Sequence, residues 1–241
     1  MHLKTIVLLV GFTFFNLSCK EEKPAITFTE NNYLLSNDNI VSINIPEAHG
    51  NAEITKKINT SLEAKIQAFL NTSQSNENSG KSINNSIDAF NNEFKDFKSS
   101  FPESQQIWEA QFDGEVLYQS NDIISIALTS YVNTGGAHGM LTVSFLNFNP
   151  NTGDILGNTE LINDTQGFKK AALPFLLKSV ENKDTDIKQN TEFPMPENMA
   201  YSTSGFILLY NPYEIAPYSS GLIECTIPYE YVAQYLVFNS L

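Results

Sequence analysis

A histidine inside a glycine-rich segment is the first residue of this chain that could do chemistry. His138 lies in residues 134–139, which read TGGAHG. Glycines let a backbone approach a ligand closely, so this imidazole could serve as a general base or as a metal ligand. It could equally hold its own loop together through hydrogen bonds to the backbone. No HExxH motif and no Cys/His spacing accompanies it, so the sequence indicates no metal and no cofactor.

A second candidate is the loop between Pro212 and Pro217, which carries Tyr213 and Glu214 and leads into Tyr218. The two prolines restrict the backbone, so we expect a stiff loop. Aromatic side chains lose little entropy when a partner covers them, which suits this loop to recognition. The alternative is an internal loop that closes the edge of a sheet, with its tyrosines buried.

No pattern in the sequence identifies an enzyme. Acidic residues are numerous, yet no spacing selects the pair of carboxylates that a glycoside hydrolase needs. There is no GxSxG nucleophile elbow and no glycine-rich phosphate loop. Cys225 alternates with Ile223 and Ile227, which indicates a buried strand residue and not a nucleophile. We therefore expect a protein without catalytic activity.

The first residues have the pattern of a secretory signal. Lys4 precedes an apolar run at residues 6–15, which is too short to span a membrane. The run leads to a small residue and Cys19, which resembles the relaxed lipobox of the Bacteroidetes group. The Lys-Glu-Glu that follows resembles the lipoprotein export signal of that group. We expect a signal peptide over residues 1–18, palmitate and further acyl chains on Cys19, and a tether over residues 19–25. The alternative is ordinary secretion with a chance cysteine.

The charge of the chain is strongly acidic. Against 27 Asp and Glu stand 14 Lys and no Arg, and the formal net charge is −13 at pH 7. This balance excludes nucleic-acid binding, which needs clustered Lys and Arg. An acidic surface attracts cationic partners. The alternative is that the charge only keeps the protein soluble.

Hydropathy periods divide the rest of the chain into strands and helices. Alternation predicts strands at residues 40–45, ending at Pro46, and at 108–119, 124–131, 141–145, 206–210 and 222–228. Apolar residues at every third or fourth position predict helices at 54–69, 83–97, 165–176 (kinked or restarted at Pro174) and 229–238. Residues 71–85 and 183–200 are polar and predict loops. The strands between 108 and 145 are joined by short turns, which predicts an antiparallel meander with one buried and one solvent-facing side.

Two segments resemble a known family. The first combines residues 131–139 (YVNTGGAHG) with residues 148–153 (FNPNTG), and the second is residues 206–218 (FILLYNPYEIAPY) followed by IPY at 227–229. Together they resemble the paired extracytoplasmic domains of unassigned function that occur beside the PdaC peptidoglycan deacetylase and in RsiV, the lysozyme-sensing anti-sigma factor. The resemblance extends over nearly all of the chain after the signal.

The resemblance implies an α+β fold with helices packed on one side of an antiparallel sheet. It implies two intimately packed sub-domains, a PdaC-like one at residues 26–135 and an RsiV-like one at residues 136–241. It implies no single activity, because the deacetylase chemistry belongs to a separate catalytic domain for which we expect no room here. The property that the resemblance does imply for this chain is the binding of a ligand outside the cytoplasm.

We therefore expect an outer-membrane lipoprotein, exposed at the cell surface, that binds a cationic protein such as lysozyme. The alternative is an accessory protein or an enzyme that acts on peptidoglycan or another cell-wall glycan. Its membrane attachment is the lipid on Cys19. The residues expected to contact a ligand are Tyr131, Asn133, His138, Tyr213, Glu214 and Tyr218.

Overall fold

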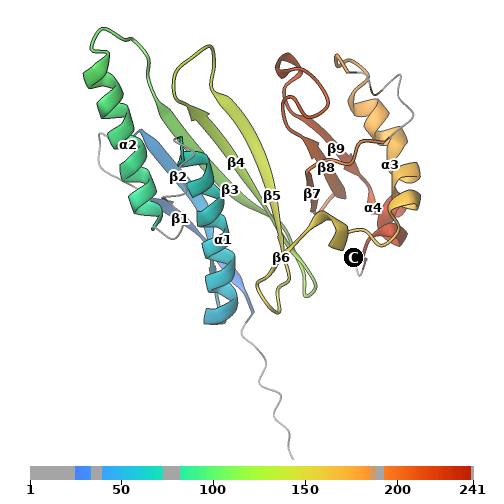
Figure 1. The fold of residues 1–241 in the computed structure, drawn as a ribbon. Coiled ribbons are helices and arrows are strands. Elements are labelled where there is room, and N and C mark those ends of the chain that lie inside the picture. Colours follow the sequence, from blue (N-terminus) through green and yellow to red (C-terminus); the bar gives the residue numbers. More distant parts are fainter. Residues whose placement is uncertain (1–24, 34–39, 73–81, 186, 188–192, 240–241) are drawn as a thin grey trace, which may run out of the picture.

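The structure (Figure 1) is a computed structural model that describes residues 25–239, except residues 34–39, 73–81, 186 and 188–192. The expected signal peptide over residues 1–18 lies outside the described residues, as does the expected tether apart from Ala25. Within the described part of the chain, no helix is both long enough and apolar enough to cross a membrane.

Six strands form the larger of two sheets. In spatial order they are β1 (Thr27–Tyr33), β2 (Val41–His49), β3 (Glu109–Gln119), β4 (Ile124–Asn133), β5 (Met140–Phe148) and β6 (Ile155–Leu156). Neighbouring strands pair antiparallel except β2 and β3, which run parallel. A parallel pair needs a long crossover, and here two helices return the chain to the end of the sheet where β2 began. Strands β3 to β5 form the meander that the sequence predicted, and β6 extends it by one short strand that was not predicted.

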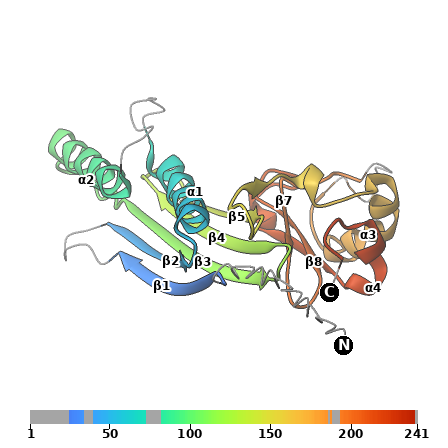
Figure 2. The ribbon, with the colours of Figure 1, turned by 90° about the horizontal axis from the view of Figure 1, so that it is seen from below.

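Helices α1 (Ala52–Leu70) and α2 (Ile83–Ser100) cover one face of this sheet (Figure 2). The side chains of Asn51 and Ser82 accept backbone N–H hydrogen bonds at the start of each helix and so cap it. The apolar stripe of α1 is buried at every position: Ile54, Ile58, Leu62, Ile66 and Leu70. The first core therefore lies between the two helices and strands β2 to β4.

Strand β3 separates the two faces of the sheet. Ala110 and Phe112 are buried in the core beneath the helices, whereas Gln111, Asp113 and Glu115 are exposed on the opposite side. Of the described helices, none lies over β1 to β4 on that opposite side (Figure 2). The predicted division into a buried and a solvent-facing side is confirmed for this part of β3, whereas on β4 the side away from the helices is buried at Ser125, which bonds to β7 of the smaller sheet described below.

A smaller sheet with its own helices forms the C-terminal part of the chain. It contains β7 (Asn198–Tyr201), β8 (Phe206–Tyr210) and β9 (Ile223–Ile227), all antiparallel, with α3 (Thr165–Ser179) and α4 (Tyr229–Val232) beside them. Phe168 of α3 packs edge-on against Phe206 of β8 in a second core. Cys225 is 3% exposed in that core, as predicted, and burial raises the pKa of its thiol to about 11.

The two cores meet where β5 and β4 contact β7. Asn147 Nδ2 donates to the carbonyl of Met199 at 2.8 Å, and Ser125 Oγ accepts from the N–H of Tyr201 at 3.2 Å. Ser125 Oγ also donates to Asn147 Oδ1 at 2.6 Å, so these buried polar groups satisfy one another. The α+β fold with two intimately packed sub-domains is thus confirmed. The expected division between residues 135 and 136 lies in the β4–β5 connection, and the larger sheet continues across it to β6.

The prediction that the first strand ends at Pro46 is wrong, because β2 continues to His49. Proline has no N–H for a ladder, but β2 pairs with β3 only from Val41 to Asn44, so no bond to β3 is lost. Gly114 on β3 makes room for the ring, since a Cβ there would lie 2.6 Å from Pro46 Cδ.

Four other sequence-based predictions need correction. Strand β7 lies inside residues 183–200, which were predicted to be loop, because four residues are too few to show a period. Helix α3 is continuous through Pro174 and does not restart there. The predicted helix at residues 229–238 is shorter, since α4 gives way to a 3₁₀ turn at Ala233–Tyr235. Strand β1 was not predicted at all.

Candidate binding site

The β4–β5 connection holds the first candidate residues. Asn133 ends β4, and its Oδ1 accepts a hydrogen bond from the N–H of Gly135 at 3.0 Å. Gly135 and Gly136 have φ values of 92° and 98°, a backbone conformation that residues with side chains rarely adopt. His138 follows and is exposed. Asn133 therefore shapes the turn that presents His138.

The His138 ring stacks on Tyr218, which comes from the β8–β9 connection. The ring centroids are 3.8 Å apart and the planes differ by 17°. Both side chains also bond to the carbonyl oxygen of Gly139, with His138 Nδ1 at 3.0 Å and Tyr218 Oη at 2.9 Å. A carbonyl only accepts, so Nδ1 carries the proton and Nε2 of the neutral ring is an acceptor. Loops of the two sub-domains thus meet at Gly139.

Tyr131 of β4 packs directly against Gly139. A Cβ on Gly139 would lie 2.4 Å from Cζ and Oη of Tyr131, so the tyrosine ring occupies the space that a larger residue would need. Gly139 is buried and Tyr131 is half-buried. Glycine at position 139 therefore leaves room for the ring of Tyr131 beside the residue whose carbonyl binds His138 and Tyr218.

The proline-bracketed loop directs one tyrosine into solvent. Tyr213 is 62% exposed and has a φ of 72°, the one positive φ among the described residues other than glycine. Its N–H donates to the carbonyl of Ala216 at 3.0 Å. Its ring centroid lies 5.8 Å from that of Tyr218. We call the three neighbouring side chains His138, Tyr218 and Tyr213 the ring row.

Glu214 turns its carboxylate inward. Oε2 accepts from the N–H of Asn211 at 2.9 Å, and Oε1 accepts from the N–H of Glu197 at 2.7 Å. Burial raises the pKa of this carboxyl, an effect that the two hydrogen bonds oppose. Both oxygens thus hold the loop to its surroundings.

Asn211 fastens the same loop to β5. Its Oδ1 accepts from the N–H of Val143 at 2.8 Å, and its Nδ2 donates to the carbonyl of Val143 at 2.9 Å. Asn198 Oδ1 accepts from the N–H of Phe145 at 3.0 Å. Side-chain amides thus pair with the outer edge of β5 as another strand would. Sequence reasoning missed both residues, and the Asn-Pro pair at 211–212, a turn signal, is the one feature that points to Asn211.

The structure gathers four of the six predicted ligand-contacting residues in one place: Tyr131, His138, Tyr213 and Tyr218. The side chains of the other two, Asn133 and Glu214, are hydrogen-bonded to the backbone of the loops that carry the ring row. Cys19 lies outside the described residues.

A second candidate surface is the side of the larger sheet that α1 and α2 leave uncovered, which we call the open face. Its carboxylates are Glu30 on β1 and Glu109, Asp113 and Glu115 on β3, aligned through the strand register. Strands β1 to β6 contain no lysine. The lysines of the described residues lie on α1, α2 and α3 and at Lys183.

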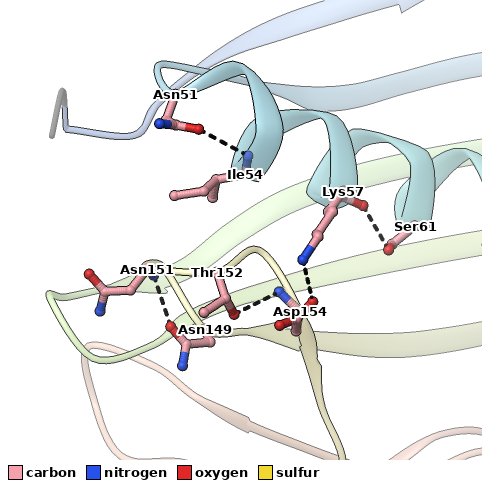
Figure 3. A network of polar contacts seen from close by, with 8 residues as sticks. All are labelled: Asn51, Ile54, Lys57, Ser61, Asn149, Asn151, Thr152 and Asp154. Carbon is pink, nitrogen blue, oxygen red and sulfur yellow. Dashed lines mark hydrogen bonds and ion pairs between the residues drawn. The ribbon is translucent and has the colours of Figure 1, made fainter.

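The segment 148–153, part of the family resemblance, forms the turn between β5 and β6 and packs on the start of α1 (Figure 3). Gly153 has a φ of 73°, and a Cβ there would lie 2.5 Å from the carbonyl oxygen of Ile54. Asp154 pairs with Lys57 of α1 at 2.7 Å. This motif therefore joins the sheet to its helix.

Among the described residues, no group of three or more His, Cys, Asp or Glu side chains is placed to bind a metal ion. The contacts of His138 are the ring of Tyr218 and the carbonyl of Gly139.

Fold and site together define a class: two α+β sub-domains packed on each other, with loops from both meeting in a row of rings. Residues 29–141 match the family described as Deacetylase PdaC, and residues 160–230 match the family described as Protein of unknown function DUF3298. The chain therefore carries a PdaC-family domain and a DUF3298-family domain in tandem, which confirms the resemblance seen in the sequence. No curated protein matches the chain.

Solved structures share this fold. A DUF3298-family member from Bacteroides fragilis aligns with a TM-score of 0.63 at 15% identity, over 90% of this chain and 96% of that one. A DUF3298-family protein from Pseudomonas aeruginosa aligns with a TM-score of 0.56 at 20% identity, over 91% and 97%. At such identities the likeness shows the fold alone.

The family names do not define an activity. Together the two domains suggest an extracytoplasmic module of unclear function. DUF3298 is by its description of unknown function, whereas the N-terminal family carries the name of a deacetylase. The names thus leave both binding and catalysis open.

Proposed function

We propose that this protein is a lipoprotein of the outer membrane, exposed at the cell surface, whose open face binds a cationic protein such as lysozyme and catalyses no reaction. The observation that carries the proposal is the separation of charge between the open face and the helices. The open face presents carboxylates on strands that contain no lysine. The lysines of the described residues lie mainly on the helices.

Charges of one sign on one face act together. Alternate residues of a strand are about 7 Å apart, which is within the Debye length of about 8 Å at physiological salt. Asp113 and Glu115 are exposed and have this spacing on β3. A basic partner would be steered to this face, and its binding would weaken as salt rises.

The position of the N-terminus fits a lipid anchor. Strand β1, the first element of the described chain, begins at the end of the larger sheet opposite to the β4–β5 connection (Figure 1). A lipid on Cys19 would therefore hold the module with the ring row pointing away from the membrane.

Calorimetry with a C-type lysozyme tests the proposal. The full chain in detergent micelles is titrated at about 50 mM and about 300 mM salt. We expect binding at low salt that weakens clearly at high salt. The double variant Asp113→Asn, Glu115→Gln should bind roughly fivefold more weakly at low salt, and its affinity should depend less on salt.

The matched control removes two charges elsewhere. Asp88 and Asp96 are exposed on α2, so Asp88→Asn, Asp96→Asn removes the same amount of negative charge and leaves the open face intact. This variant should bind like the wild type. Absence of binding at low salt would reject a cationic partner of this kind, and equal weakening by both double variants would reject the open face as the site.

A further inference from the structure

We propose that the outer edge of β1 binds an extended basic segment of another protein, which adds to the larger sheet as a further antiparallel strand beside Glu30. This inference goes beyond the proposed function, because it concerns the backbone of a sheet edge and an extended chain segment, and not a folded protein on the open face. It rests on three observations: the direction of the backbone groups of β1, the contrast with the opposite edge of the sheet, and the carboxylates around β1.

Strand β2 bonds to its two neighbours through alternate residues. At its start, the carbonyl of Ile40 accepts from the N–H of Ala110 on β3 at 2.8 Å. Near its end, the N–H and the carbonyl of Ala48 bond to the side chain of Asn59 on α1, at 2.8 and 3.1 Å. Backbone groups alternate in direction along a strand. The even-numbered residues of β2, Pro46 among them, therefore face away from β1.

The residues of β1 opposite these even-numbered residues turn their backbone outward. Opposite residues of an antiparallel pair either bond to one another or both face away. Phe28 lies opposite Ala48 and Glu30 opposite Pro46, in a register without a shift, and Asn32 continues the alternation. Of the segments that the structure describes, none lies beyond β1 to pair with it (Figure 2). The N–H and carbonyl groups of Phe28, Glu30 and Asn32 are thus directed towards an incoming strand.

The opposite side of the sheet is closed to such pairing. The side chains of Asn211 and Asn198 bond to the backbone of β5, and β6 pairs with the end of the same strand. Strand β1 has none of the usual protections of an edge, because its sequence TFTENNY contains no lysine and no proline and pairs without a bulge. The edge of β1 is therefore suited to strand addition.

The charge of Glu30 disfavours a second copy of the chain as the added strand. Glu30 is exposed and is the middle residue of β1. Two β1 strands paired antiparallel over their full length would place Glu30 of each copy opposite its equivalent, and like charges directly opposite destabilise a strand pair. A lysine or arginine of another protein at that position forms a favourable cross-strand pair instead.

Further carboxylates lie beside β1 on the side that faces the helices. Glu47 of β2 accepts a hydrogen bond from Asn31 Nδ2 of β1 at 3.0 Å. A cavity of about 70 Å³ is lined by both of these residues and by Glu63 of α1. Strands β1 and β2 contain no lysine. Glu30 is the carboxylate on the edge strand itself, so it determines which face of the incoming strand is basic.

Two methylated peptides test the strand pairing. The blocked peptide TKTKTKT is titrated by calorimetry into the full chain in micelles of a non-ionic detergent, at about 50 mM salt. We expect saturable binding with a Kd in the micromolar to millimolar range. In an antiparallel strand, the residue opposite Glu30 shares its face and directs its N–H at β1. N-methylation of the lysines should therefore abolish binding, whereas N-methylation of the threonines keeps these donors and should leave the affinity nearly unchanged.

A pair of protein variants tests the charge. Glu30→Gln should weaken binding of the unmethylated peptide roughly fivefold. Glu230 is exposed on α4 of the other sub-domain, so Glu230→Gln removes the same charge away from the edge and should leave the affinity unchanged. Thermal unfolding of each variant verifies its fold. Equal weakening by both variants would overturn the assignment to β1.

Amide hydrogen exchange locates the bound peptide. At saturation, the N–H groups of Phe28, Glu30 and Asn32 should exchange roughly tenfold more slowly than in the free protein. Equal affinity of the two methylated peptides would show that charge alone attracts the peptide, and would overturn strand addition. Absence of saturation at about 5 mM peptide would also overturn it.

A second copy is tested in the same measurement. Protection of these three N–H groups that rises with protein concentration, in the absence of peptide, would assign the edge to another copy of the chain and overturn the proposal. Because lysozyme is not present in any of these experiments, none of the results depends on whether a cationic protein binds the open face.

Discussion

The imidazole of His138 and the phenol ring of Tyr218 lie face to face, 3.8 Å apart, and both bond to the carbonyl of Gly139. His138 belongs to the connection between β4 and β5 in the larger sheet, and Tyr218 to the connection between β8 and β9 in the smaller one. The contact therefore joins the two sub-domains at the point where the candidate residues gather.

Removing Tyr218 should weaken this junction. Tyr218→Ala loses both the stacked ring and the hydrogen bond to Gly139, and we expect the free energy of unfolding to fall by about 2 kcal/mol. Tyr218→Phe keeps the stack and should lose only about 1 kcal/mol. Urea denaturation measures both values. Equal losses in the two variants would show that the hydroxyl, and not the ring, holds the loops together.

Glycine should relieve the strain at Tyr213. A residue with a Cβ in the left-handed region is disfavoured by roughly 1 kcal/mol, whereas glycine is not. Tyr213→Gly should therefore be more stable than Tyr213→Ala by about 1 kcal/mol in thermal unfolding, although both remove the ring. A less stable glycine variant would contradict the view that the backbone is strained here.

Asn211 should contribute more to the free energy of unfolding than its partly exposed position implies. Asn211→Ala leaves the N–H and the carbonyl of Val143 without this partner, and we expect a loss of about 2 kcal/mol. Asn84→Ala, on the exposed side of α2, is the control and should change stability little. Chemical denaturation compares the two, and equal effects would argue against the pairing with β5.

The half-buried carboxyl of Glu214 should make stability depend on pH. Burial raises its folded-state pKa above the usual 4.5, so the folded protein binds more protons than the unfolded chain just above that pH. Stability should therefore fall as pH rises through the folded pKa. Glu214→Gln lacks this titration, so the stability difference between wild type and variant should change with pH in that window. Unfolding measured from about pH 3 to about pH 8 checks this, and a constant difference would contradict it.

If a lipid is attached at Cys19, the two cysteines should differ in their labelling with palmitate. In cells grown with labelled palmitate, Cys19→Ser should lose the label and leave the membrane fraction, because no thiol remains at the lipobox. Cys225→Ala is the control and should stay labelled, since Cys225 is a buried core residue. Retention of label in Cys19→Ser would place the lipid elsewhere or show that there is none.

Local periodicity was sufficient wherever an element was long and had one buried side. The apolar spacing of α1 and the alternation of β3 correspond to elements in the structure, because both periods follow from backbone geometry within one segment. Periodicity did not predict the short or polar elements. Strand β7 has four residues, and β1 (TFTENNY) has few apolar ones, so pairing with neighbours decides their conformation.

The sequence by itself determined the α+β class, the acidic balance and the stiff, tyrosine-bearing loop after Pro212, since composition and local backbone restriction are properties of adjacent residues. Only the tertiary structure decided that His138 stacks on Tyr218, that Asn211 pairs with Val143, and that the carboxylates of β1 and β3 share one face of the sheet. Each of these depends on register or on the meeting of distant segments. Such contacts form when the whole chain packs, and no local pattern encodes them.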